Sequence, residues 1–425
     1  MVKDLKNIKQ YRVYLTPQIK QGIYGNEINV TSSLDAGTTF DVTNSTINMG
    51  LIKKYIDDGD YTAGIQKFSD LSITLFNTKG QFNSETKGST IFKYSRDLCK
   101  VRVEYYDRVS IPYTVFRGLV NEEATRQDFV NDTVNLRVLS EDSILRKVNV
   151  PAGTVTGGMT FEGAINAILQ LPLISAIMSY NSANINVDLN NTIDNPDSFD
   201  LEPADKSLLK LLAVSNSVLT VDSDSVVYVS SRQHRQVTPK YFFHGAYDLQ
   251  NRENIISIKA FNSGIHRSFN TVKINDTSYS EQIFVDTYNS RRKSSSYDFI
   301  EGIVKERVIA ARLVREFKVP KEELKLTVET ERVKDVELLD LVSINYPKRY
   351  ETKQDVKLIT WSNLKYGGGA CVGSKYNKPF GSFSIKDRIG WKVTGIEKSP
   401  KNLTTTLRLR KIGLKRGDST WQRMI

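Results

Sequence analysis

Few residues of this chain combine the types and the spacing that enzyme chemistry requires. The run from Gly368 to Lys375 comes closest, because a phosphate-binding loop has glycines five residues apart, followed by Lys-[Ser/Thr] and a helix. In this sequence Ser374 precedes Lys375, and Asn377-Lys378-Pro379 stands where the helix would begin. We therefore interpret the segment as a Gly-rich loop and expect no nucleotide site there.

Residues that could bind a metal ion are scattered. The three histidines are 10 and 22 residues apart, without the close pairing or the carboxylates of a zinc site; they are His234, His244 and His266. Asp57-Asp58-Gly59-Asp60 is similar to the start of a calcium loop, but the later ligands are missing, which favours a turn. Asp222 and Asp224 are also expected in a turn. The sequence therefore predicts neither a metal ion nor another cofactor.

Nucleophiles and acid/base pairs lack support as well. No G-x-S-x-G turn occurs, and neither of the two cysteines, Cys99 and Cys371, stands beside a histidine. Two cysteines in 425 residues also exclude a disulfide framework. The paired carboxylates lie in polar connecting stretches, where they solvate a surface; they are Glu122-Glu123 and Glu322-Glu323. The sequence therefore predicts a protein that is not an enzyme.

The charge of the chain is unevenly distributed. The 59 basic and 48 acidic residues give a net charge of +11, but residues 1–225 hold 22 basic and 27 acidic residues, whereas residues 226–425 hold 37 and 21. All of the positive excess thus lies in the second half. This asymmetry suits a chain whose ends face different partners, or whose copies pack acidic surface against basic surface. A solvated basic face is the alternative.

The C-terminus alternates basic and apolar residues, and its basic residues are the candidate contact residues of the chain. One interpretation is a contact with DNA or with an acidic neighbour. The other is an edge strand in which Lys and Arg prevent unwanted pairing. The five residues are Arg408, Arg410, Lys411, Lys415 and Arg416.

No part of the sequence suits a membrane. With 39% hydrophobic and 25% charged residues, the composition is that of a soluble globular protein. The most apolar window, residues 164–178, is interrupted by Asn166, Gln170 and Pro172, and a spanning helix needs about 18 apolar residues. Residues 1–11 contain three lysines but no apolar core of a signal peptide. We expect no membrane-spanning segment and a chain that stays in the cytoplasm where it is made.

The remaining pattern is that of a mainly β chain with a few helices. Alternation of apolar and polar residues between Gly, Asn, Asp and Ser turns predicts strands over most of the chain. Residues 217–221 and 226–230 flank a four-residue turn and predict a hairpin. Helices are expected at residues 161–171, capped by Thr160 and stopped by Pro172; at 206–215, capped by Asp205; and at 301–317.

The third of these helices is amphipathic by its spacing. Four apolar residues are predicted to share one face: Val304, Val308, Ala311 and Val314. Arg312 and Glu316 are predicted to pair outside that face.

The helical stretch, residues 151–248, reads as an α/β insert between two β regions, residues 1–150 and 249–425. The two β regions look alike, because each reads strand, gap, strand, hairpin and strand ending in Leu-Arg. The matching segments are residues 101–105, 115–120 and 132–138 in the first region, and 341–346, 391–396 and 403–409 in the second. The pattern predicts a duplicated β domain. A duplicated domain in a homotrimer presents six similar surfaces, so that three chains can dock onto a six-fold ring.

In their order, these segments resemble the tail or baseplate hub proteins of tailed phages and related contractile injection systems. The resemblance covers roughly residues 11–412. Its motifs are Gly64-Ile65, the run Leu75-Phe76-Asn77-Thr78-Lys79-Gly80-Gln81-Phe82, the strands at 101–105 and 116–118, Asn270-Thr271-Val272-Lys273-Ile274, the helix at 301–317, the strand at 323–329 and Asp340-Leu341-Val342-Ser343-Ile344. Two features depart from the family: Leu338-Leu339 stand where a glycine often precedes the Asp, and residues 350–388 have no counterpart.

The resemblance implies a mainly β fold with an α/β insert, in which two tube-like β-barrel domains flank a small α/β domain. It implies a structural virion protein that is assembled in the host bacterial cytoplasm. Three copies would form the hub that links the six-fold tail tube to the three-fold tip or spike and surrounds the DNA channel used in ejection. The implied partners are two further copies of the chain, the tail tube or distal tail protein, the tip or spike protein, the tape measure protein and DNA in the lumen. A basic nucleic-acid-binding protein that uses the C-terminal half is the alternative.

Overall fold

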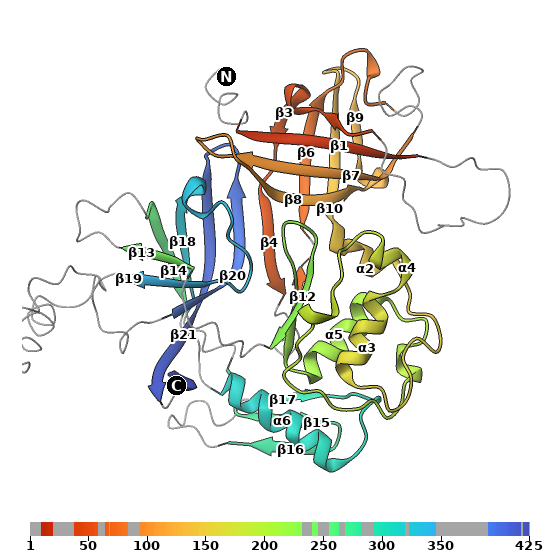
Figure 1. Ribbon diagram of the computed structural model, residues 1–425, viewed down its shortest axis with the longest axis vertical. Coiled ribbons are helices and arrows are strands. Elements are labelled where there is room, and N and C mark those ends of the chain that lie inside the picture. The colour runs from red at the N-terminus through yellow and green to blue at the C-terminus, as the bar shows by residue number, and fades with distance from the viewer. Residues whose placement is uncertain are drawn as a thin grey trace, which may run out of the picture.

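The computed structural model describes residues 10–19, 38–57, 64–67, 69–83, 94–231, 240–244, 255–262, 268–281, 292–318, 323–345, 390–417 and 420–424. These residues form twenty-two strands and five α-helices, arranged as two large sheets, a three-stranded sheet and a helical region (Figure 1). The predicted class, mainly β with an α/β part, is confirmed.

The first sheet has eight strands in the order β2-β1-β7-β8-β10-β6-β3, with β9 beside β10. All of its pairs are antiparallel. Side chains alternate along β6, where Leu71, Ile73 and Leu75 are buried in the core of this sheet. The strands are β1 (Tyr11–Ile19), β2 (Phe40–Asp41), β3 (Thr46–Met49), β6 (Asp70–Phe76), β7 (Tyr94–Tyr106), β8 (Pro112–Val120), β9 (Arg126–Asp128) and β10 (Thr133–Ser140).

The second sheet has eleven strands and draws on all three regions of the sequence. Its order is β12-β11-β5-β4-β20-β21-β18-β14, with the pair β13-β19 beside β20 and β22 beside β21. The strands are β4 (Ile52–Asp57), β5 (Gly64–Lys67), β11 (Ser217–Val221), β12 (Val227–Ser231), β13 (Tyr241–His244), β14 (Ser257–Asn262), β18 (Glu323–Glu329), β19 (Leu341–Asn345), β20 (Gly390–Ser399), β21 (Thr404–Gly417) and β22 (Thr420–Met424). Within the described residues, the strand orders of both large sheets are open paths.

The two sheets share one order of strands. In the first sheet, β3, β6, β10, β8 and β7 are antiparallel neighbours in that order. In the second sheet the corresponding neighbours are β14, β18, β21, β20 and β19, again all antiparallel. The sixth strand differs in direction, since β1 is antiparallel to β7 whereas β13 is parallel to β19. The similarity seen in the sequence thus reflects a repeated arrangement of five strands.

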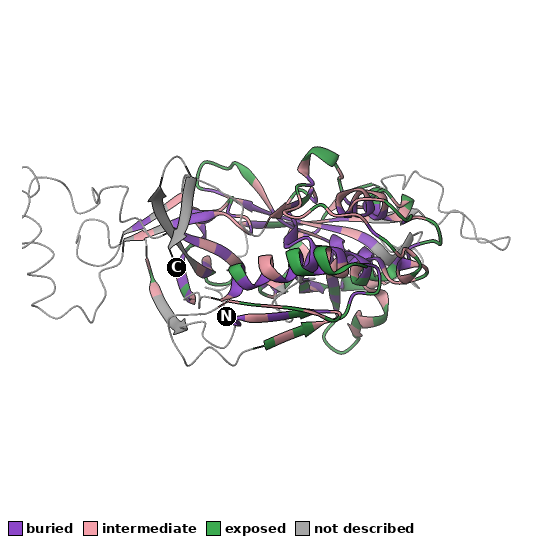
Figure 2. Ribbon diagram, turned by 90° about the horizontal axis from the view of Figure 1, so that it is seen from below, coloured by how far each residue is buried: buried purple, intermediate pink, exposed green. Residues whose placement is uncertain are grey.

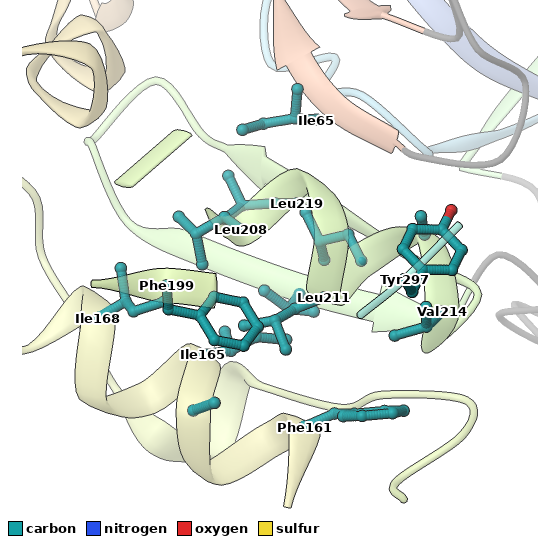
Figure 3. Packing of buried hydrophobic residues seen from close by; sticks show 14 of the residues in the cluster. Ile65, Phe161, Ile165, Ile168, Phe199, Leu208, Leu211, Val214, Leu219 and Tyr297 are labelled. Atoms are coloured by element: carbon teal, nitrogen blue, oxygen red, sulfur yellow. The ribbon is translucent and has the colours of Figure 1, made fainter. Parts of the chain in front are cut away.

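The helical region follows the first sheet and has its own core. Its helices are α2 (Ile144–Lys147), α3 (Phe161–Leu169), α4 (Pro172–Ser175) and α5 (Ala204–Val214). Side chains of α3 and α5 pack together with Phe199, and Leu219 of β11 and Ile65 of β5 extend this cluster toward the second sheet (Figure 3). The predicted cap is present, because the Thr160 side chain accepts a hydrogen bond from the Gly163 N–H at 3.1 Å.

The second predicted cap is wrong. Pro203 occupies the N-cap of α5, and Asp205 lies in the first turn of the helix. An acidic side chain is favourable in that position as well, through the positive end of the helix dipole, so the sequence alone did not separate the two placements. The predicted hairpin is confirmed as the antiparallel pair β11-β12.

Helix α6 (Ile303–Phe317) packs on the three-stranded sheet of β15 (Thr271–Ile274), β16 (Thr277–Ser280) and β17 (Arg292–Ser295). Its predicted apolar face is wrong in most of its residues, since Val304 and Val308 are exposed and only Val314 of the four is buried. The helix carries apolar residues on two sides, and the buried side contains Ile309, Leu313 and Phe317. Its exposed residues are visible along the helix in Figure 2.

The predicted pairing across this helix is also wrong. Glu316 is buried, and Arg312 binds Asp188 of the insert through two hydrogen bonds of 2.7 and 2.8 Å. The helix begins two residues later than predicted because Gly302, with a φ of 104°, is outside the helical region.

The hydrophobic cores do not follow the three sequence ranges. The core of the helical region also contains Phe269, Val272, Phe299 and Leu313, which come from beyond residue 248. No described helix is long and apolar enough to cross a membrane.

Candidate functional site

The turn of the β11-β12 hairpin, residues 222–225, is the centre of a polar junction. Asp222 shapes the turn, because its Oδ1 accepts hydrogen bonds from the N–H groups of Asp224 at 2.8 Å and Val226 at 2.9 Å. The prediction that Asp222 and Asp224 belong to a turn is confirmed. Two serines of the turn, Ser223 and Ser225, bind groups on opposite sides of the junction.

Ser223 lies between a strand of the first region and a loop of the last. Lys54 of β4 is buried, and its Nζ donates to Ser223 Oγ at 2.9 Å and to Glu337 Oε2 at 3.0 Å. Ser223 in turn donates its N–H to Glu337 Oε1 at 3.1 Å. Burial alone would raise the pKa of Glu337, but the charge of Lys54 and the Ser223 hydrogen bonds outweigh it and lower that pKa. Three regions distant in the sequence therefore meet in one charged, hydrogen-bonded contact.

Ser225 lies on the other side of the turn, against the short 3-10 helix Glu141–Ser143. Its hydroxyl donates to Glu141, whose pKa burial raises. The neighbouring carboxyl, Asp142, accepts from Gln66 Nε2 at 3.2 Å, and Gln66 Oε1 accepts the Val221 N–H at 3.0 Å. Burial raises the pKa of Asp142 to about 6. This side of the junction thus holds two buried carboxyl groups, and the amide of Gln66 links one of them, Asp142, to β11.

The loop of residues 334–340 also holds the first sheet. Lys334 Nζ forms an ion pair with Asp107 Oδ2 at 2.6 Å, in the turn between β7 and β8. Just before it, Glu331 Oε2 accepts a 2.7 Å hydrogen bond from the hydroxyl of Tyr105. The buried Lys398 donates to the Lys334 carbonyl at 2.9 Å, and burial lowers the pKa of Lys398 to about 8. The loop therefore connects the two large sheets as well as the hairpin.

This arrangement is suited to holding parts together. Its two ion pairs, Lys54 with Glu337 and Lys334 with Asp107, join segments that are distant in the sequence. Among the described residues, no group of three or more His, Cys, Asp or Glu side chains could hold a metal ion.

The predicted contact residues of the C-terminus lie on β21, and the structure describes the side chains of two. Arg408 is exposed and stacks on Tyr55, with its guanidinium 4.2 Å from the ring centre. Arg410 forms an ion pair with Glu323 at 3.1 Å. Both lie on the face of the sheet opposite the buried Leu407 and Leu409, so they belong to one surface.

The other three predicted contact residues continue the same strand. Lys411 is paired with Trp391 of β20, whereas Lys415 and Arg416 are paired with Gln422 and Trp421 of β22. Residues 404–410 of β21 are paired on both sides, with β18 and β20, whereas residues 411–412 are paired with β20 alone and residues 413–417 with β22 alone. The interpretation as an edge strand is therefore wrong for Arg408 and Arg410, and the contact with DNA or an acidic neighbour stays a prediction.

The remaining sequence candidates are not brought together. Cys99 is buried and free, and His244 lies in β13. Asp57 ends β4, and Glu122 and Glu123 lie in a short 3-10 helix. Glu323 binds Arg410, as described above. The candidates outside the described residues are His234, His266, Asp58, Asp60, Cys371, Glu322 and residues 350–388 with the Gly-rich loop.

The junction has no signature in the sequence that would identify it as a site. Lys54, Ser223, Glu337 and Lys398 are separated by more than sixty residues from one another and carry no motif. One signal was available: Lys54 and Lys398 interrupt otherwise amphipathic strands on the apolar side, which points to a buried partner of opposite charge.

No protein-family model and no curated protein sequence matches the chain. Solved structures of tail proteins are similar in fold. A tail protein from Neisseria meningitidis matches 97% of this chain and 98% of its own length, with a TM-score of 0.56 and 11% sequence identity. A prophage tail protein from Listeria monocytogenes covers 94% of each chain (TM-score 0.49, 10% identity). A 43 kDa prophage tail protein from Shewanella oneidensis covers 94% of this chain and 97% of its own (TM-score 0.48, 9% identity). The similarity to the Neisseria meningitidis protein confirms the resemblance to tail proteins at the level of the fold.

Proposed function

We propose that the chain is a structural tail protein, three copies of which form a hub ring at the distal end of a phage tail. The observation that carries the proposal is the repeated order of five antiparallel strands in a chain whose fold is similar to that of a solved tail protein. Two similar sheets in each of three chains present six similar surfaces, which fits docking onto a six-fold tube. The same ring has three-fold symmetry for a tip or spike on its other side.

In this assembly, residues 1–150 and 249–425 supply two tube-like β-barrel domains, and residues 151–248 supply the α/β domain between them. The ring continues the channel for DNA during ejection. Its partners are the tail tube or distal tail protein, the tip or spike protein and the tape measure protein. Assembly takes place in the host cytoplasm, and the finished protein is part of the virion. The role is mechanical and not enzymatic.

The polar junction supports this mechanical role. Lys54, Glu337 and Lys334 connect the two large sheets and the hairpin by buried or partly buried ion pairs. Removing one partner of such a pair strongly destabilises the fold, because the charge of the other partner is left buried. A rigid connection between the two repeats keeps their spacing fixed, as docking on a regular tube requires.

The test is the mass of the purified chain by light scattering over a range of concentrations, with negative-stain images of the peak. We expect a trimer that appears as a ring with a central hole. A chain that is monomeric at all concentrations would contradict self-assembly into a hub.

A second candidate function is DNA binding, and the outer face of the second sheet favours it. Arg408 lies directly opposite Lys325 in the register of β18 and β21, and both side chains are exposed. Like charges in this position are unfavourable unless a counterion or ligand separates them. The test is the fluorescence anisotropy of a duplex oligonucleotide at increasing salt. The double variant Lys325→Ala/Arg408→Ala is expected to reduce the slope of log K against log salt by about 2. Affinity and slope that are equal in the wild type and the variant would exclude this face.

A further inference from the structure

Two exposed apolar patches lie far apart in the fold. The first, the tip, is the turn between β9 and β10, where Phe129 and Val130 are 76% and 92% exposed. The second, the stripe, is the outer side of α6, where Ile303, Val304 and Val308 are 72%, 78% and 45% exposed. Figure 1 shows β9 and α6 near opposite ends of the long axis. Exposed clusters of large apolar side chains mark surfaces that bind other molecules.

The tip is a fixed structure that displays its apolar side chains. Asp128 Oδ1 accepts hydrogen bonds from the N–H groups of Val130 at 2.9 Å and Asn131 at 3.1 Å, and its Oδ2 accepts Asn131 Nδ2 at 2.7 Å. The carbonyl of Asp132 accepts the Asn77 N–H at 2.6 Å, which joins the turn to the end of β6. None of these bonds uses the side chain of Phe129 or Val130. Fold stability therefore gives no reason for two apolar residues at this position.

The tip and the stripe carry opposite charge. Asp128 and Asp132 flank the tip and are exposed. Hydrogen bonds from the Asn131 side chain and N–H lower the pKa of Asp128, so its carboxylate is ionised at neutral pH. On α6, the exposed Arg307 stands between Val304 and Val308, whereas Arg315, two turns further, is paired with Glu281 at 3.4 Å, and Glu301 is exposed just before the helix. The charge available within the stripe is therefore that of Arg307, which is opposite in sign to Asp128 and Asp132 beside the tip, so the two patches are complementary in apolar character and at this charge.

We infer that the tip of one copy docks on the α6 stripe of the next copy, in a head-to-tail contact between subunits. This inference rests on the proposed trimer and names the residues that close it. A contact between two different patches forms a ring when its rotation closes after a whole number of copies. A stable interface buries roughly 1,600 Å² in total, so these five side chains are its apolar anchor and the flanking charges belong to its rim.

Two variants separate the halves of the contact. Phe129→Ser/Val130→Ser removes the tip, and Val304→Ser/Val308→Ser removes the stripe. Since the side chains are exposed and Ser is about as helix-forming as Val, both variants are expected to fold, which circular dichroism checks. Val109→Ser is the matched control, because Val109 is 73% exposed in the turn between β7 and β8.

Light scattering over a concentration series measures the assembly. The wild type and the control are expected to be trimeric, and each variant is expected to dissociate at a concentration at least about tenfold higher than the wild type does. An equimolar mixture of the two variants is expected to form one-to-one dimers and no trimers, because one intact tip and one intact stripe remain. Trimers that persist in both variants, or a mixture without dimers where the wild type is trimeric, would overturn the contact and leave the proposed hub intact. A wild type that is monomeric throughout would contradict the hub itself, and the contact with it.

Discussion

The two repeats of the molecule have the same five antiparallel strands but different insertions between the first and second of them. In the first repeat, β4 and β5 separate β3 from β6, and both strands join the second sheet. In the second repeat, β15, β16, β17 and α6 separate β14 from β18, and they pack on the core of the helical region. Each repeat therefore sends its insertion into another part of the molecule. The strand order is therefore the frame that the two repeats share, while the insertions connect them.

The repeats also differ in charge on their outer faces. In the first sheet, Arg137 of β10 forms an ion pair with Asp70 and stands opposite Ser72 of β6. In the second sheet, Arg408 of β21 stands opposite Lys325 of β18. The first face is locally neutral and the second is basic, which agrees with the positive excess in the second half of the sequence.

The largest expected effect concerns two glycines in corresponding strands, Gly118 of β8 and Gly395 of β20. A Cβ at Gly118 would lie 2.4 Å from the Leu139 carbonyl oxygen, whereas at Gly395 it would lie 2.6 Å from the Tyr55 ring and 3.1 Å from Arg408. Gly118→Ala should lower the free energy of unfolding by about 3 kcal/mol and Gly395→Ala by about 1 kcal/mol, since side chains move more easily than backbone.

Urea unfolding measures both glycine variants. Gly50→Ala is the control, because its Cβ would have ordinary contacts of 3.4 Å or more. Equal losses for Gly118→Ala and Gly395→Ala would show that the two strands are packed alike and would remove this difference between the repeats.

The buried carboxyl of Asp142, which follows the last strand of the first repeat, is expected to make the stability of the fold depend on pH. Burial raises the pKa of Asp142 to about 6, so the fold favours its neutral form. The unfolded carboxyl ionises at about pH 4, and the contribution of Asp142 to stability is therefore lost as the pH rises from about 4 to 6. The free energy of unfolding of Asp142→Asn, relative to that of the wild type, should rise by about 2–3 kcal/mol between these pH values. Above this window the difference should remain constant. Urea midpoints at pH 4, 5, 6 and 7 test the prediction, and a difference that is independent of pH would refute it.

Much of the frame could be predicted from the sequence, because strand alternation and turn residues are local signals. The hairpin of residues 217–231 and the Thr160 cap are examples. The face of α6 could not be predicted, since the helix has apolar residues on two sides and only the neighbouring sheet decides which is buried. The junction could not be predicted either, because Lys54 and Glu337 meet through the packing of three regions.

The junction, which connects the two repeats, is predicted to differ from the outer face of the first sheet. Lys54→Met should lower the free energy of unfolding by about 2 kcal/mol, because it leaves Glu337 partly buried without its cation. Arg137→Met in the first sheet should cost less than about 0.5 kcal/mol, since that ion pair is exposed. The double variant Lys54→Met/Glu337→Leu should recover part of the loss. Chemical unfolding of the four proteins gives the answer, and equal effects of Lys54→Met and Arg137→Met would mean that the junction holds nothing together.

The smallest expected effect concerns the basic face of the second sheet. Lys325→Glu places a carboxylate directly opposite Arg408 and should raise the free energy of unfolding by about 0.5 kcal/mol, because opposite charges replace like charges in one cross-strand pair. Lys325→Met should give about half of that gain, since it removes the repulsion without adding an attraction. The gain should shrink at high salt, where exposed charges are screened. A Lys325→Glu variant less stable than the wild type at low salt would show that Lys325 is already held by an acidic neighbour, and the second face would then be as neutral as the first.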